Sequence, residues 1–206
     1  MIMNTKKNSG KDIKVIGIGG RGLNTINNLI DLNLQGVRFV SINTDFQSLK
    51  NSKAYINLLI GEKITKGESA KGNPLIGRGS AFESAKAIKE IVTNSQYAFI
   101  ITGLGGGTGT GAAPVIAEFC KNSGAKVIAI VSTPFSFEGK KRKTHAYQGI
   151  YALDNTVDAI LIRANDRIRE GIDKNETILN MFKKADEFIL QIIYQYAIAQ
   201  VSSIIQ

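Results

Sequence analysis

The sequence is poor in residues that form covalent or metal cross-links. It contains one cysteine, Cys120, and one histidine, His145, among 206 residues. One thiol cannot form an internal disulfide, and one thiol with one imidazole cannot complete a zinc site built from such ligands. The composition therefore predicts a cytoplasmic protein without a zinc site of this kind.

The N-terminal segment lacks the apolar core of a signal peptide. Residues 1–11 are polar and basic, so we expect a flexible arm and no secretion. The rest of the chain has no internal repeat and no interdomain linker. With 43% hydrophobic residues, its length suits one sizeable core, and we expect a single soluble domain.

Aromatic residues are absent from the densest basic run. The net charge of +9 favours partners that carry phosphate, whether nucleotides or nucleic acids. The run 140–143 has four basic residues without an interleaved ring, which is more typical of a solvated helix start than of a surface that stacks bases. We therefore expect no nucleic-acid partner.

Continuous apolar runs dominate the expected strands. Such runs suit a parallel sheet that is covered on both faces. The strands are expected at Ile13–Ile18, Val37–Ile42, Tyr55–Ile60, Tyr97–Thr102, Lys126–Ser132 and Ala159–Arg163. Helical patterns lie between them at Leu23–Leu34, Arg78–Thr93, Ala112–Asn122 and Arg142–Leu153. The predicted fold class is α/β, with a doubly wound, mostly parallel sheet whose strands lead into loops that share one rim.

Five glycines in seven residues make residues 105–111 a candidate phosphate loop. The segment reads Gly-Gly-Gly-Thr-Gly-Thr-Gly between an expected strand and an expected helix. Without Cβ atoms, successive backbone N–H groups and the helix N-terminus can approach an anion, and Thr108 and Thr110 add hydroxyl donors. A flexible linker is the alternative, but the segment lacks the serine of such linkers.

A second glycine pattern is compatible with a different ligand, a dinucleotide. Gly17, Gly19 and Gly22 form a complete Gly-x-Gly-x-x-Gly, and Asp45 follows the next strand. This spacing is typical of a Rossmann module for NAD(P) or FAD, in which an acidic residue binds a ribose. A dehydrogenase does not need a second glycine loop, however, and the chain leaves no room for a substrate domain.

Taken together, the loops resemble those of the tubulin/FtsZ family of GTP-binding cytoskeletal proteins, and most closely the N-terminal GTP-binding domain of its FtsZ branch. Residues 105–114 are similar to the family's signature phosphate loop. The other matching segments lie in order along the chain, at 19–24, 43–45, 73–78, 134–142, 165–166 and 182–186. The resemblance implies a basic arm at 1–11, a GTP-binding domain at 12–174 and a central-type helix at 175–206.

The resemblance also implies the ligand, which is GTP or GDP, accompanied by Mg²⁺ in the case of GTP. The residues expected to bind the nucleotide are Gly19, Gly20, Arg21, Asn24, Asn43, Asp45, Gly72, Asn73, Gly105, Gly106, Gly107, Thr108, Gly109, Thr110, Gly111, Pro134, Glu138, Arg142, Asn165, Phe182 and Asp186. Asp45 is expected near Mg²⁺ or its waters, and a cap of the following helix is its alternative role. Glu138 is expected to accept from ribose hydroxyls, and Arg142 to reach sugar or phosphate.

Three of these residues are expected at the guanine base. A carboxylate accepts two hydrogen bonds side by side, so Asp186 can accept from guanine N1–H and from the exocyclic amine, which adenine cannot donate together. Asn165 supplies an amide, and Phe182 lies one helical turn before Asp186, where its ring can stack on the base. The alternatives are core packing for Phe182 and an exposed helix charge for Asp186. As a rim carboxylate, Asp186 is expected to tolerate alanine without loss of the fold.

The sequence departs from the family pattern in three places. The third loop, at residues 68–72, contains Lys71 where small residues and glycine are usual, and this side chain either screens a third phosphate or blocks the backbone. Arg21 stands where the first loop has a small residue. Arg163 replaces an apolar residue close to the expected base pocket.

Charge is absent from residues 188–206. Six Gln and Ser residues there favour a core or interface helix over a membrane span. In the family such a helix leads to an acidic loop that serves the nucleotide of the next subunit, head to tail, and the chain shows no counterpart of that loop. The resemblance therefore implies a GTP-binding cell-division domain of polymerising proteins, with hydrolysis that needs an acidic loop from another FtsZ-like subunit. The alternative is a non-hydrolysing regulator that caps filaments of full-length relatives.

Overall fold

One six-stranded sheet organises the computed structural model, which describes residues 13–34, 36–170 and 186–195. Every neighbouring pair of strands is parallel, and the order across the sheet is β3-β2-β1-β4-β5-β6. The strands are β1 Ile13–Ile18, β2 Val37–Asn43, β3 Ile56–Leu59, β4 Tyr97–Gly103, β5 Lys126–Thr133 and β6 Ala159–Ala164. The prediction of a doubly wound parallel α/β fold is confirmed.

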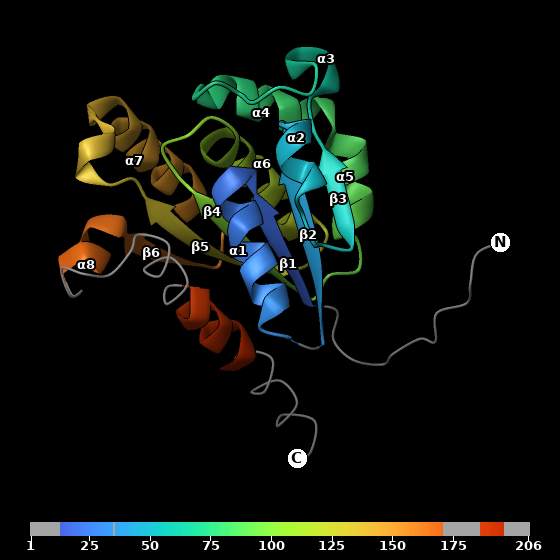
Figure 1. The fold of residues 1–206 in the computed structure, drawn as a ribbon. Helices are drawn as coiled ribbons and strands as arrows, with labels where there is room; N and C mark the ends of the chain where they lie inside the picture. The colour runs from blue at the N-terminus through green and yellow to red at the C-terminus, as the bar shows by residue number, and fades with distance from the viewer. Residues whose placement is uncertain (1–12, 35, 171–185, 196–206) are drawn as a thin grey trace.

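Helices cover both faces of this sheet (Figure 1). They are α1 Gly19–Asp31, α2 Phe46–Lys50, α3 Glu62–Thr65, α4 Pro74–Glu83, α5 Ala85–Val92, α6 Thr108–Asn122, the 3₁₀ turn η1 Ser136–Glu138, α7 Lys140–Asp154 and α8 Asn165–Glu170. A further helix, at residues 186–195, lies on the same face of the sheet as α1. In the described part of the chain, no helix has both the length and the apolar character to cross a bilayer.

The continuous apolar strands have a core on each side. On one face, Ile26 of α1 packs with Ile189 and Ile193 of the helix at 186–195 and with apolar residues of β1, β4 and β5. On the other face, α5, α6 and α7 contribute the fully buried Ile88, Ile116 and Leu153, among others. Because successive strand residues point to opposite faces, a strand buried on both sides needs apolar residues throughout.

The helices α1 and α6 begin earlier than expected, inside the glycine-rich segments. Glycine has a low helix propensity, which predicts loops there. The structure shows why glycine is present in these first turns: a Cβ on Gly22 would lie 2.5 Å from the Ile101 carbonyl oxygen, and one on Gly109 would lie 2.3 Å from Thr102 Oγ1. Close packing on β4 therefore requires glycine, and both helices start directly at the edge of the sheet.

The single helix expected over residues 78–93 is two helices, α4 and α5. Ser84 lies between them, and its Oγ accepts a hydrogen bond of 3.0 Å from the Gly61 N–H. Helix α4 starts four residues earlier than expected, because Pro74 occupies its first position and Asn73 Oδ1 accepts from the Leu75 N–H at 3.0 Å. Proline and an asparagine cap are favourable at a helix start.

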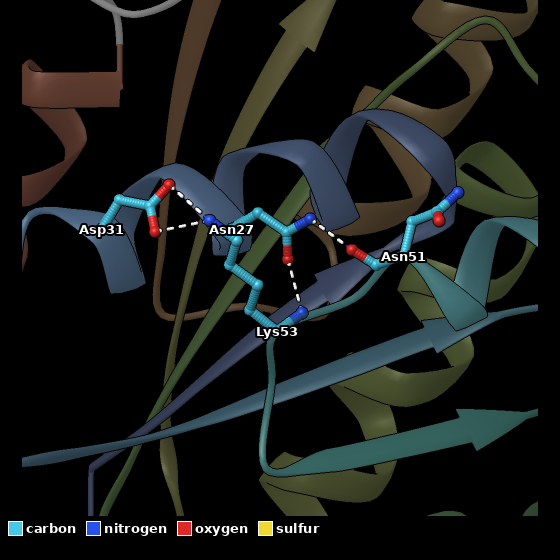
Figure 2. Close-up of polar contacts among 4 residues, drawn as sticks. All are labelled: Asn27, Asp31, Asn51 and Lys53. Carbon is cyan, nitrogen blue, oxygen red and sulfur yellow. Dashed lines mark hydrogen bonds and ion pairs between the residues drawn. The ribbon is translucent and has the colours of Figure 1, made fainter.

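A polar cluster fastens the α2–β3 connection to α1 (Figure 2). The Asn27 side chain donates to the Asn51 carbonyl oxygen and accepts from the Lys53 N–H, both at 2.8 Å. Lys53 Nζ lies 2.6 Å from an Asp31 carboxylate oxygen, in an ion pair whose side chains are 52% and 57% exposed. Pairs this exposed contribute little to stability, so the backbone contact to Asn27 matters more for the position of β3.

Candidate functional site

A cleft of about 450 Å³ lies where the carboxyl ends of the strands meet the starts of α1 and α6. In doubly wound sheets, ligands bind at this edge. Most of the residues expected at the site line this cleft together, namely Gly19, Gly20, Arg21, Asn43, Asp45, Gly72, Gly106, Gly107, Thr108, Gly109, Pro134, Glu138, Arg142 and Asn165. The loops that follow the strands, which were expected to share one rim of the sheet, therefore line one cavity.

The N-termini of two helices converge on this cleft. Neither α1 nor α6 has an acidic residue in its first turn or a side-chain cap. A Cβ added to Gly20 or Gly106 would meet no atom within 4 Å, although both glycines line the cleft. Helix N-termini carry partial positive charge and N–H groups without partners in the helix, so the cleft can cradle an anion such as phosphate.

Threonine side chains hold the floor of the cleft in place. Thr44 Oγ1 and Thr108 Oγ1 lie 2.8 Å apart and are buried, which joins the end of β2 to the start of α6. Thr110 Oγ1 accepts a hydrogen bond of 2.8 Å from the Gly105 N–H. The Thr110 hydroxyl therefore stabilises its own loop, and neither Thr110 nor Gly105 lines the cleft.

Among the described residues, two carboxylates line the cleft, and both accept hydrogen bonds from the protein. Asp45 Oδ1 accepts from the Ser48 N–H at 3.0 Å, so the cap on α2 is present. Glu138 Oε1 accepts from the Phe135 N–H at 2.9 Å, and its other oxygen pairs with Arg142. These contacts fix both carboxylates at the wall of the cleft.

The side-chain oxygen of Asn165 is a hydrogen-bond acceptor to which no group of the described structure donates. It follows β6, is 6% exposed and lines the cleft. Its Oδ1 is buried and finds no hydrogen-bond partner in the described structure. Buried polar atoms are nearly always paired in folded proteins, so this oxygen is suited to accept a hydrogen bond from a ligand N–H.

Asp186 lies outside the cleft lining, in the interior between α1 and the helix at 186–195. It is fully buried, with 0% of its surface exposed. Its Oδ1 accepts from Arg21 Nη2 and Thr25 Oγ1, both at 3.0 Å, and its Oδ2 accepts from Asn28 Nδ2 at 2.6 Å. The alternative of an exposed helix charge is therefore wrong, and so is the expectation of a rim carboxylate that carries little packing.

The remaining expected residues lie around the site or outside the described structure. Asn24 is exposed on α1, and Asn73 caps α4. A Cβ on Gly111 would lie 1.9 Å from the Pro74 carbonyl oxygen, so this glycine serves the contact between α4 and α6. Phe182 lies outside the described residues, and its stacking role stays a prediction.

The sequence does not predict every residue that lines the cleft. Those not expected there are Ile18, Ser48, Ser69, Ala70, Gly103, Leu104, Ser132 and Thr133, whereas Lys71, for which the sequence leaves two roles open, also lines it. Ser132 and Thr133 end β5, so the rule that ligands bind at the carboxyl ends of strands could have found them. Lys71 has a φ of 48° and pairs with Glu68 at 2.7 Å, with both side chains mostly exposed.

Comparison with known proteins decides the family. The model of the Tubulin/FtsZ family GTPase domain matches residues 12–173, which is well over half of the chain. The chain belongs to the tubulin/FtsZ family. The sheet order alone could not decide this, because dinucleotide-binding Rossmann domains share it.

Solved structures of tubulin/FtsZ relatives agree. The FtsZ of M. jannaschii, described as an empty dimer, is 41% identical with a TM-score of 0.85 over 93% of this chain and 55% of its own. The GDP-bound monomer of CetZ1 from Haloferax volcanii is 26% identical with a TM-score of 0.75 over 87% of this chain and 58% of its own. This chain thus spans a little over half the length of these FtsZ and CetZ structures. The family model that it matches is that of the family's GTPase domain.

Proposed function

We propose that the chain binds GTP and GDP in the cleft, with the phosphates on the N-termini of α6 and α1 and the base beside Asn165. The observation that carries this proposal is the convergence of two uncapped helix starts on glycines whose open side faces the cleft. Arg21, Lys71 and Arg142 also line it and complement negative charge. The CetZ1 relative is described as GDP-bound, which supports the same ligand class.

Mg²⁺ fits this cleft as a companion of GTP. When bound, it neutralises charge on the phosphates while it keeps most of its waters. The described residues contain no group of three or more His, Cys, Asp or Glu side chains that could hold a metal ion by themselves. Asp45, which Ser48 orients, would accept a hydrogen bond from a water of the ion.

Hydrolysis needs a group that the described cleft does not offer. Water attacks a phosphoryl group when a side chain positions and polarises it. Asp45 caps α2, and Glu138 is engaged with Phe135 and Arg142. We therefore propose that the acidic group comes from another FtsZ-like subunit, which docks head to tail, and that the chain by itself turns GTP over slowly.

Titration with fluorescent GDP, with ATP as competitor, tests the binding proposal. We expect saturable binding that excess GDP reverses and ATP does not. Gly106→Ala should weaken it about tenfold or more, because the new methyl group enters open space in the cleft without a clash in the fold. Gly79→Ala, on α4 and away from the cleft, is the matched control. Equal competition by ATP would remove the guanine assignment, and unchanged affinity of Gly106→Ala would remove the phosphate assignment.

Phosphate release separates a GTPase from a regulator. Because Asp45 and Glu138 already accept hydrogen bonds from the protein, a second role is also favoured. In this role the chain binds GTP without hydrolysis and caps filaments of a full-length FtsZ. The chain alone should release phosphate slowly and form no straight filaments. Mixed with such an FtsZ, a cap should reduce sedimented polymer at substoichiometric ratios. Rapid hydrolysis by the chain alone, rising cooperatively with concentration, would contradict both roles.

A further inference from the structure

Arg21 belongs to two sites at once. The residue lies on the first turn of α1 and lines the cleft. Its guanidinium donates from Nη2 to Asp186 Oδ1 at 3.0 Å, and the two side chains are 19% and 0% exposed. The residue therefore connects the cleft to the buried carboxylate that is expected to recognise guanine.

The acceptor positions of Asp186 are largely filled. An ionised carboxylate has about four lone-pair positions, two on each oxygen. Oδ1 accepts from both Arg21 and Thr25, while Oδ2 accepts from Asn28. Recognition of guanine through N1–H and the exocyclic amine needs one donor on each oxygen. A guanine base can therefore bind this carboxylate side by side only after Oδ1 loses a donor.

Arg21 is the donor that can leave. Thr25 is 1% exposed and its hydroxyl lies inside the core, whereas Arg21 already reaches the cleft. A second cation stands close by, because Arg163 and Arg21 both line a smaller cavity of about 100 Å³, together with Phe188 and Ile189. Burial, followed by the positive charge of Arg21, lowers the pKa of Arg163 to about 10, so Arg163 remains a cation at neutral pH.

Two arginines thus stand beside one carboxylate. Arg163 Nε and Nη1 are buried and find no hydrogen-bond partner in the described structure. When Arg21 moves toward the phosphates in the cleft, Arg163 leaves a positive charge near Asp186. The loss of Arg21 therefore does not leave the carboxylate without a neighbouring cation.

We propose that Arg21 is a specificity-determining residue. It occupies an acceptor position on the Asp186 carboxylate, so that a guanine base must displace Arg21 before it can bind there through both of its donors. The proposal rests on the proposed nucleotide function. It implies that part of the binding free energy of guanine goes into breaking the Arg21–Asp186 pair, and that the chain discriminates weakly between guanine and a base without the exocyclic amine. Displacement also removes a contact between α1 and the helix at 186–195.

Calorimetric titration with GDP and with inosine diphosphate tests this inference. Inosine diphosphate lacks the exocyclic amine but has the same sugar and phosphates, so loss of the Arg21 charge affects both ligands alike and cancels in the ratio of their Kd values. For the wild-type chain, we expect inosine diphosphate to bind less than about threefold more weakly than GDP. For Arg21→Ala, we expect a ratio of about tenfold or more, equal to roughly 1.4 kcal/mol.

Lys53→Ala provides the matched control, because it removes a different ion pair of α1, the one with Asp31 (Figure 2). Neither Lys53 nor Asp31 lines the cleft. The ratio of this variant should equal that of the wild type. A wild-type ratio of tenfold or more would overturn the inference without any variant, and so would an unchanged ratio in a folded Arg21→Ala protein. Failure of both nucleotides to bind the wild-type chain would instead contradict the proposed function, and the inference with it.

Discussion

Asp186 is a fully buried carboxylate that three side chains of α1 hold by hydrogen bonds. Asp186→Ala would leave the guanidinium of Arg21 without this partner in a mostly buried position. Removing one member of a buried pair costs about 3 kcal/mol. We therefore expect a lower free energy of unfolding in urea and faster hydrogen exchange in residues 186–195. Glu187→Ala, at an exposed neighbouring position, is the control, and equal stability of the two variants would contradict the anchoring role.

Cys120 offers a second measurement on a single residue. It is buried in α6, and burial raises the pKa of its thiol to about 12. The thiolate is the reactive form, so at pH 8 only about one thiol in ten thousand is reactive in the folded chain. We expect a thiol reagent to label the native protein very slowly and the denatured protein at once. Because the chain has one cysteine, the absorbance of the released product reports unfolding directly, and fast labelling under native conditions would contradict the burial.

Helices α4 and α6 approach each other closely at positions occupied by glycine. A Cβ on Gly111 would lie 1.9 Å from the Pro74 carbonyl oxygen, and one on Gly77 would lie 2.3 Å from the Gly107 carbonyl oxygen. Backbone atoms cannot move aside as a side chain end can, so Gly111→Ala should destabilise the chain by about 2–3 kcal/mol. Gly79→Ala should change stability by less than about 1 kcal/mol, because its Cβ would meet only the end of the flexible Ile64 side chain, at 3.3 Å. Equal urea midpoints for the two variants would contradict this view of the contact.

The strands and the helix starts differ in how far the sequence predicts them. Strand β1 is apolar at almost every position and buried on both faces, so its position and the parallel sheet follow from residue type alone. The starts of α1 and α6 do not follow from residue type. Contacts with β4 require glycine there, and helix propensity does not take such tertiary contacts into account. The pairing of Arg21 with Asp186 joins residues that are 165 positions apart, and no local pattern marks such a contact.

In the molecule as a whole, the carboxyl edge of the sheet, the two helix starts and Asn165 form one cleft in a member of the tubulin/FtsZ family. We propose that this cleft holds a guanine nucleotide, and a crystal structure of the chain with GDP and Mg²⁺ tests this proposal. We expect phosphate oxygens within hydrogen-bond distance of the N–H groups of residues 106–109 and the base against Asn165. A nucleotide bound elsewhere on the surface, or an empty cleft at saturating GDP, would contradict it.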